Sequence, residues 1–153
     1  MADISDLWKA ICGVLIADST LTTTLGVAAA SIWYAEDGTP AKLAYPGVRV
    51  KFLTEGPVTD LSAVGAFEPR VDIDIFGVSQ AVNRQIAWRL DQLLDIPRLR
   101  PAGLSAGDWK INLLMRRDTR AIGKTGITNA DGASVYQLNT DWTMKAATVV
   151  ASA

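Results

Sequence analysis

Apolar residues recur at helical spacing in two segments of the chain. The first segment follows Asp3 and Ser5, either of which can cap a helix. The second begins after Ser79, another capping residue, and ends near Asp95, just before Pro97. Their apolar faces hold Ile4, Leu7, Trp8, Ile11, Val14 and Leu15 in the first segment, and Val82, Ile86, Leu90, Leu93 and Leu94 in the second. The pattern predicts two amphipathic helices.

The sequence predicts five strands. The first is a short aromatic run at about residues 31–35, and the others alternate apolar and polar residues at about 45–52, 67–76, 108–117 and 136–144. In the fourth strand we expect Trp109, Ile111, Leu113 and Met115 to face the core. In the fifth strand the core-facing set is Tyr136, Leu138, Thr140, Trp142 and Met144. Glycine and proline punctuate the intervening segments, so residues 54–66, 97–107 and 118–132 are predicted to be loops.

This order of elements predicts an α+β fold. Most strands are joined by short connections and the two helices lie far apart in sequence, which disfavours a doubly wound sheet. We expect a mainly antiparallel sheet of four to five strands with both helices packed on one face. The 153 residues, 49% of them apolar, suffice for one core. We therefore predict a single domain over residues 1–148 and a flexible tail at 149–153.

Charge and cysteine content narrow the classes of function. The net charge of −1 argues against a general nucleic-acid or membrane-surface binder. Residues 1–75 carry ten acids and five bases, and residues 76–153 carry six acids and ten bases, which suits head-to-tail contact between copies. Asp3 and Asp6 stand where a signal peptide needs basic residues, and the single cysteine, Cys12, lies in an apolar run. We expect the chain to be assembled in a reducing cytoplasm.

The sequence holds few of the groups that enzymes use. It contains no histidine, which removes the commonest general base and most zinc sites. Cys12 has no histidine partner and is predicted to be a buried core residue. The run from Gly123 to Thr125 resembles the end of a phosphate-binding loop, but Asp118 stands where the pattern needs its first glycine. These observations favour a protein that works by assembly.

The strand over residues 67–76 presents a charged face. Arg70, Asp72 and Asp74 alternate with apolar residues, so they are predicted to point away from the core, toward a partner or a lumen. Asp72 and Asp74 would lie about 7 Å apart on such a strand. A carboxylate pair of this kind can also bind Mg²⁺ or act as acid and base, so a small Mg²⁺-dependent enzyme is the alternative from a different class.

The second helix carries Trp88 almost opposite its apolar face, near Arg84. Large aromatics are enriched at interface hot spots, so both residues are predicted to lie at a contact between subunits. The alternative is a tryptophan covered by a loop of its own chain.

The densest cluster of basic residues begins the predicted loop over residues 118–132. Arg117, Arg120 and Lys124 belong to it, together with Arg116. Loops of this length in compact domains are usually functional, so we expect an assembly loop that contacts a neighbouring subunit. Contact with nucleic acid is the alternative, although no aromatic residue interleaves the cluster to stack on bases.

The order and texture of these elements are similar to those of a known family. The opening helix is followed by Ala-Asp-Ser-Thr-Leu-Thr-Thr-Thr-Leu-Gly at residues 17–26, and Tyr-Pro-Gly-Val-Arg-Val at 45–50 comes next. Val-Asp-Ile-Asp-Ile-Phe-Gly at 71–77 then leads into a helix that ends in Leu-Asp-Gln-Leu-Leu at 90–94. The last strand holds Tyr-Gln-Leu-Asn-Thr-Asp-Trp at 136–142. Over about residues 4–145 the chain resembles the tail-terminator or tail-completion proteins of long-tailed bacteriophages and phage-like particles.

The resemblance implies a structural virion protein of the tail or neck. It implies a hexameric ring that caps the finished tail tube, stops tube polymerisation and offers a surface to the neck of the head. The implied partners are copies of the chain, the tail tube protein and a head-tail connector protein. The predicted assembly loop would then contact a neighbouring subunit or the tail tube through Arg117, Arg120 and Lys124. DNA would pass through the lumen without specific binding, and neither a cofactor nor a membrane is implied. The family has no catalytic motif to carry over, and another neck or connector protein is the alternative within the same class.

Overall fold

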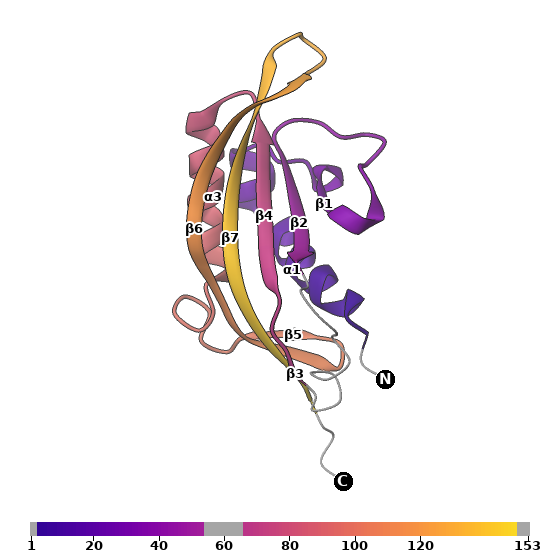
Figure 1. The fold of residues 1–153 in the computed structure, drawn as a ribbon, viewed down its shortest axis with the longest axis vertical. Helices are drawn as coiled ribbons and strands as arrows, with labels where there is room; N and C mark the ends of the chain where they lie inside the picture. The colour runs from indigo at the N-terminus through magenta and orange to yellow at the C-terminus, as the bar shows by residue number, and fades with distance from the viewer. Residues whose placement is uncertain (1–2, 54–65, 150–153) are drawn as a thin grey trace.

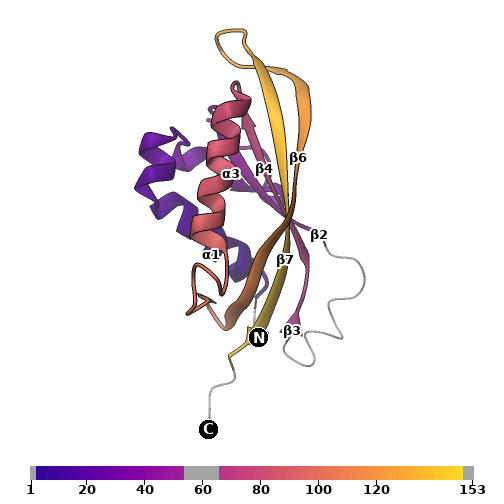
Figure 2. The same cartoon turned by 90° about the vertical axis from the view of Figure 1, so that its left-hand side faces the viewer.

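The computed structural model describes residues 3–53 and 66–149 as one layer of helices on one sheet. Figure 1 shows the curved sheet, and Figure 2 shows α1 and α3 together on one side of it. The helices are α1 (Ser5–Ala17) and α3 (Gln80–Leu94), with single turns η1 (Thr20–Thr24), η2 (Ala29–Ser31) and η3 (Ala35–Asp37). The strands are β1 (Ile32–Tyr34), β2 (Gly47–Leu53), β3 (Ala66–Phe67), β4 (Arg70–Gly77), β5 (Leu104–Ala106), β6 (Trp109–Thr128) and β7 (Ser134–Thr148).

The predicted α+β class and the placement of both helices on one face are confirmed, but the predicted sheet was too simple. Within the described ranges the sheet has seven strands in the order β1-β2-β4-β7-β6-β5, with β3 pairing β7 off this path. It is mixed, because β1 runs parallel to β2. The two additional strands have local causes. Pro69 has no N–H to donate and divides the predicted third strand into β3 and β4, and β5 forms within the predicted loop over residues 97–107.

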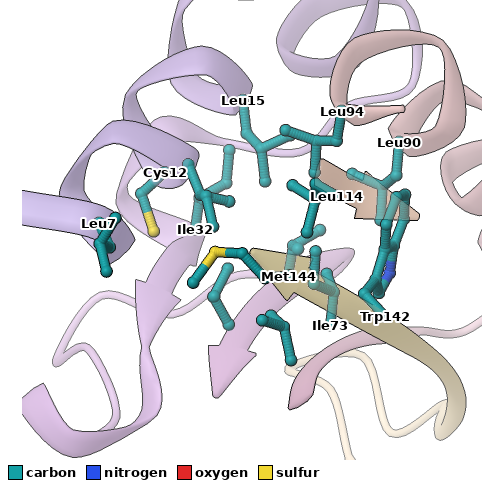
Figure 3. Packing of buried hydrophobic residues seen from close by; sticks show 14 of the residues in the cluster. Leu7, Cys12, Leu15, Ile32, Ile73, Leu90, Leu94, Leu114, Trp142 and Met144 are labelled. Carbon is teal, nitrogen blue, oxygen red and sulfur yellow. The ribbon is translucent and has the colours of Figure 1, made fainter. Parts of the chain in front are cut away.

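A single apolar cluster fills the space between the helices and the sheet. Leu7, Leu15, Leu90 and Leu94 enter it from the helices, and Trp142 enters from the sheet, all with no exposed surface. Figure 3 shows these side chains meeting around the strands. Cys12 is buried in the same cluster, as predicted, and burial raises the pKa of its thiol to about 12.

The predicted start of α3 is confirmed. The Ser79 hydroxyl accepts a hydrogen bond from the Val82 N–H at 3.3 Å and so satisfies one of the helix's free donors. A bidentate ion pair holds this helix to the chain after α1: the Arg89 guanidinium donates to both oxygens of Asp18, at 2.6 and 2.9 Å. These contacts fix the orientation of α3 and therefore the direction in which its outer residues point.

The alternation predicted for β7 is confirmed for Leu138, Thr140, Trp142 and Met144, which are all buried. The alternation predicted for β6 was wrong beyond Ile111. A shift in register between Ile111 and Leu113 reverses the alternation. Leu114 is consequently buried and Met115 is 47% exposed.

The loop predicted over residues 118–132 was also wrong. β6 continues to Thr128 and β7 begins at Ser134, so only the turn between them lacks strand structure. Gly123 and Gly126 have positive φ angles of 99° and 83°, at irregularities of the β6–β7 register. We name residues 121–135 the arm, because this part of the hairpin projects beyond the rest of the sheet (Figures 1 and 2).

Most of the loop predicted over residues 54–66 lies outside the described residues. The same holds for residues 150–153 of the predicted tail, whereas Val149 is described and exposed. No helix in the described ranges is long and apolar enough to cross a membrane.

Candidate assembly interface

The face of the sheet opposite the helices is polar along its central strands. The register places Asp72 of β4 between Lys51 of β2 and Asp141 of β7, and Asp141 lies opposite Asp118 of β6. The next row contains Arg49, Asp74, Asn139 and Arg120. Paired residues of antiparallel strands point to the same side, so these two rows form one surface, which we name the polar face.

Within the polar face, Asp74 is the centre of a hydrogen-bonded cluster. Its Oδ2 accepts from Arg49 Nη2 at 2.9 Å, and its Oδ1 accepts from Gln137 Nε2 at 3.0 Å and from Asn139 Nδ2 at 2.9 Å. The residue is only 3% exposed. The expectation that Asp74 points freely toward a partner or lumen therefore needs correction. The alternation correctly gives its side of the sheet, but its neighbours on β2 and β7 cover the carboxylate.

Arg70 and Asp72 are more accessible than Asp74. Arg70 is exposed, and its Nη2 donates to Asp141 Oδ2 at 2.8 Å. Asp72 is half-buried, and the pKa of its carboxyl is raised by burial and then by the neighbouring carboxylates of Asp74 and Asp141. The polar face thus carries both signs of charge, and Asp72 lies near two other carboxylates.

We predict that Asp72→Asn stabilises the isolated subunit at neutral pH. A raised pKa means that the folded chain holds this proton more tightly than the unfolded chain, so the carboxylate costs stability as pH rises through the folded pKa. The gain should be about 0.5 kcal/mol, because the side chain is partly solvated. It should disappear below about pH 3.9, the ordinary value for aspartate. Urea unfolding of both proteins at pH 7 and pH 3.5 measures the difference, and an Asn variant that is less stable at pH 7 would contradict it.

The geometry gives little support to a magnesium site at Asp72 and Asp74. Both oxygens of Asp74 already accept hydrogen bonds from neighbouring side chains. Within the described ranges, no group of three or more histidine, cysteine, aspartate or glutamate side chains is arranged to hold a metal ion. The carboxylates of Asp74 and Asp141 are instead held by guanidinium and amide groups of the chain itself.

Trp88 lies on the outer side of α3 and is 64% exposed, so in the subunit it is not covered by a loop of the described chain. It lines a shallow depression together with Arg84 and Ala87 of α3 and Arg116, Thr119 and Leu138 of the sheet. Arg116 is anchored there by an ion pair with Asp91. The predicted interface residues Arg84 and Trp88 therefore lie beside β6, near one edge of the sheet.

The three predicted basic residues of the assembly loop lie on β6. Arg117, Arg120 and Lys124 are all exposed. β5 pairs with β6 only as far as Ile111, and a single bridge joins Leu114 to Ile96. From Met115 onward, no other described strand pairs with the outer side of β6. The structure thus brings these residues together with Trp88 along one open edge.

Several residues of these surfaces were missed in the sequence. Arg49, Gln137 and Asn139 hold Asp74, and their role depends on pairing between distant strands. Ile122 and Ile127 are 48% and 49% exposed on the arm. Their apolar character within a glycine-rich polar segment was a signal that could have indicated a contact surface.

Comparisons with known proteins add a likeness of fold. No protein-family model matches the chain, and no curated protein matches it. Among solved structures, a chain from the "Virion of native gene transfer agent (GTA) particle" has a similar fold, with a TM-score of 0.62 and 14% sequence identity. The match covers 92% of this chain and 94% of that one. At this identity the comparison shows that nearly the whole of the two chains shares one architecture.

Proposed function

We propose that this chain is a structural protein of a phage-like virion. The observation that carries the proposal is the fold likeness to a chain of a gene transfer agent virion, which extends over nearly the full length of both chains. A match at the level of the whole chain favours a shared role in assembly over a shared local motif. Both carboxylate oxygens of Asp74 are engaged by side chains of the chain itself, which suits a structural role for this face.

Within the virion, we propose a ring that caps the tail tube, with the six copies that the family resemblance implies.

 This ring would end tube polymerisation and present a joining surface to the neck. Its partners would therefore be copies of this chain, the tube protein and a connector protein. The polar face is proposed to line the lumen through Arg70 and Asp72, with the helices outside. Its mixed charge suits DNA passage without specific binding, because its carboxylates repel phosphate while Arg49 and Arg70 are held by ion pairs.

Deleting the gene in a host that produces the particle tests this function. Without a terminator, tube subunits keep adding, so we expect tubes of uncontrolled length and heads without tails. Supplying the intact chain from a plasmid should restore tails of uniform length. Tails of normal length that fail to join heads would instead assign the chain to another position in the neck. Normal, infectious or transducing particles without the chain would contradict a structural role of either kind.

Trp88→Ala should weaken ring formation while leaving the fold intact. The side chain is mostly exposed in the subunit, so its loss costs the core little, whereas a buried interface tryptophan often contributes 2 kcal/mol or more. We therefore expect the dissociation constant of the ring to rise roughly 30-fold or more. Sedimentation velocity over a concentration series measures it, and Leu99→Ala, which truncates another exposed apolar residue, is the control. A Trp88→Ala variant with unchanged ring mass and unchanged melting temperature would contradict the prediction.

A further inference from the structure

The arm carries apolar side chains that its own subunit does not cover. Ile122 and Ile127 are each about half exposed, at 48% and 49%, on a two-stranded hairpin that extends past the body (Figure 2). Lys124 lies between them and is exposed, and Arg120 lies at the base of the arm. Two exposed isoleucines beside cations on a projecting hairpin are typical of a segment that is buried in an assembly.

A groove that suits such a segment lies at the opposite edge of the sheet, between α1 and β1. It is lined by Trp8, Ile16, Ile32, Trp33, Tyr34 and Asp37, with Lys9, Cys12 and Gly13. The indole of Trp8 stacks on the ring of Tyr34 with centroids 4.7 Å apart, which gives the groove a firm aromatic wall. Ile16 is 42% exposed there. The groove offers about 300 Å³, at the small end for a small-molecule site and suited to side chains.

The charges at the two edges are complementary. Glu36 and Asp37 are exposed beside the groove, whereas β6 presents Arg117, Arg120 and Lys124. Lys9, the cation beside the groove, has its ammonium 5.5 Å from the centre of the Trp8 ring. The arm also has Asp131, in the turn at its tip, and Asp118 precedes it on the polar face. The acidic edge belongs to the first half of the chain and the basic edge to the second, in agreement with their opposite net charges.

We propose that the arm of one subunit docks in the α1–β1 groove of a second copy of this chain. The exposed isoleucines contact the aromatic wall, and Lys124 pairs with Glu36 or Asp37. The two surfaces lie at opposite edges of the sheet, so the contact is head-to-tail, and it closes a ring when the rotation between neighbours is a whole fraction of a turn. This inference rests on the proposed ring and names the contact that would hold it together.

Paired cysteines test the contact directly. Glu36→Cys and Lys124→Cys in the same chain should form disulfides between neighbours under mild oxidation, giving a ladder of covalent oligomers on a non-reducing gel. The chain with Cys12 alone should give no ladder, since that thiol is buried. Glu36→Cys with Lys110→Cys is the matched control, because Lys110 is exposed on β6 but lies far along the strand from the arm. A ladder from the control pair equal to that from the test pair would overturn the proposal.

Charge reversal tests the same contact independently. Lys124→Glu should raise the dissociation constant of the ring at least tenfold, and adding Glu36→Lys with Asp37→Lys should recover most of that loss. Glu68→Lys, at an exposed site outside both surfaces, should not rescue. If rings form, but the arm variants change neither the covalent oligomers on the gel nor the dissociation constant of the ring, the docking proposal is wrong and the proposed ring is unaffected. If the unaltered chain stays monomeric in solution and on tails, both the ring and this contact fail.

Discussion

Shortening the arm is expected to leave a folded subunit that no longer forms rings or completes tails. The variant replaces residues 126–134 with Asn-Gly, between Thr125 and Val135, and carries Ile122→Thr and Lys124→Thr. Thr125 and Val135 are already adjacent, because the Thr125 hydroxyl donates to the Val135 carbonyl at 3.0 Å. A two-residue Asn-Gly turn suits a hairpin closed at this point. The exposed arm side chains contribute little to the subunit's own core, so its stability should change by less than about 1 kcal/mol.

Native mass spectrometry measures ring formation by this variant, and tail-completion assays measure its function. We expect monomers where the unaltered chain gives rings, and a loss of completed tails of at least a hundredfold. Ala130→Ser, at the tip of the native arm, is the control and should assemble normally. A shortened arm that still supports rings and uniform tails would show that the arm is only a connection between β6 and β7. A shortened chain that fails to fold would be recognised by its melting curve, and Lys124→Glu then carries the test in the intact arm.

Asp74→Ala is expected to cause the largest loss of stability among single substitutions on the polar face. Removing the carboxylate leaves the Arg49 guanidinium and two side-chain amides without their acceptor. Breaking a buried ion pair on one side typically costs 3–5 kcal/mol, and Arg49 is partly solvated, so we expect roughly 3 kcal/mol. Chemical denaturation at pH 7 measures the free energy of unfolding.

Asp118→Ala is the matched control for Asp74→Ala. Asp118 lies on the same face but is exposed, so its replacement should change stability by no more than about 0.5 kcal/mol. A loss below 1 kcal/mol in Asp74→Ala would mean that the cluster contributes little to the fold. The opposite signs expected for Asp72→Asn and Asp74→Ala follow from their surroundings, since one carboxylate faces other acids and the other is fully paired.

The elements that the sequence predicted well are those whose signals are local. Ser79 and the apolar spacing of α3 lie within one helix, and the alternation from Leu138 to Met144 lies within one strand. The side of the sheet on which Asp72 and Asp74 lie also follows from alternation alone. Trp88 was predicted to be on the outer face of its helix for the same reason, and it is exposed there.

The features that were missed depend on pairing between strands. A register shift near Asn112 reverses the alternation of β6, and no residue type at that position announces it. The glycines of residues 118–132 suggested a loop, but Gly123 and Gly126 serve as irregularities within a paired hairpin. The burial of Asp74 depends on Arg49, Gln137 and Asn139, which only the strand order brings to it. Local patterns predict which side of the sheet a side chain faces. They carry no information about which strands lie beside it.

The position and copy number of this chain on purified tails test the central proposal most directly. A small tag at the N-terminus, labelled with gold and viewed by electron microscopy, locates the protein, and quantitative mass spectrometry counts it against the tube protein. The proposed ring predicts label at one end of each tail, the end that joins the head, with about six copies of the 16.4 kDa chain. Label along the whole tube, or completed tails that lack the protein, would contradict a terminating ring.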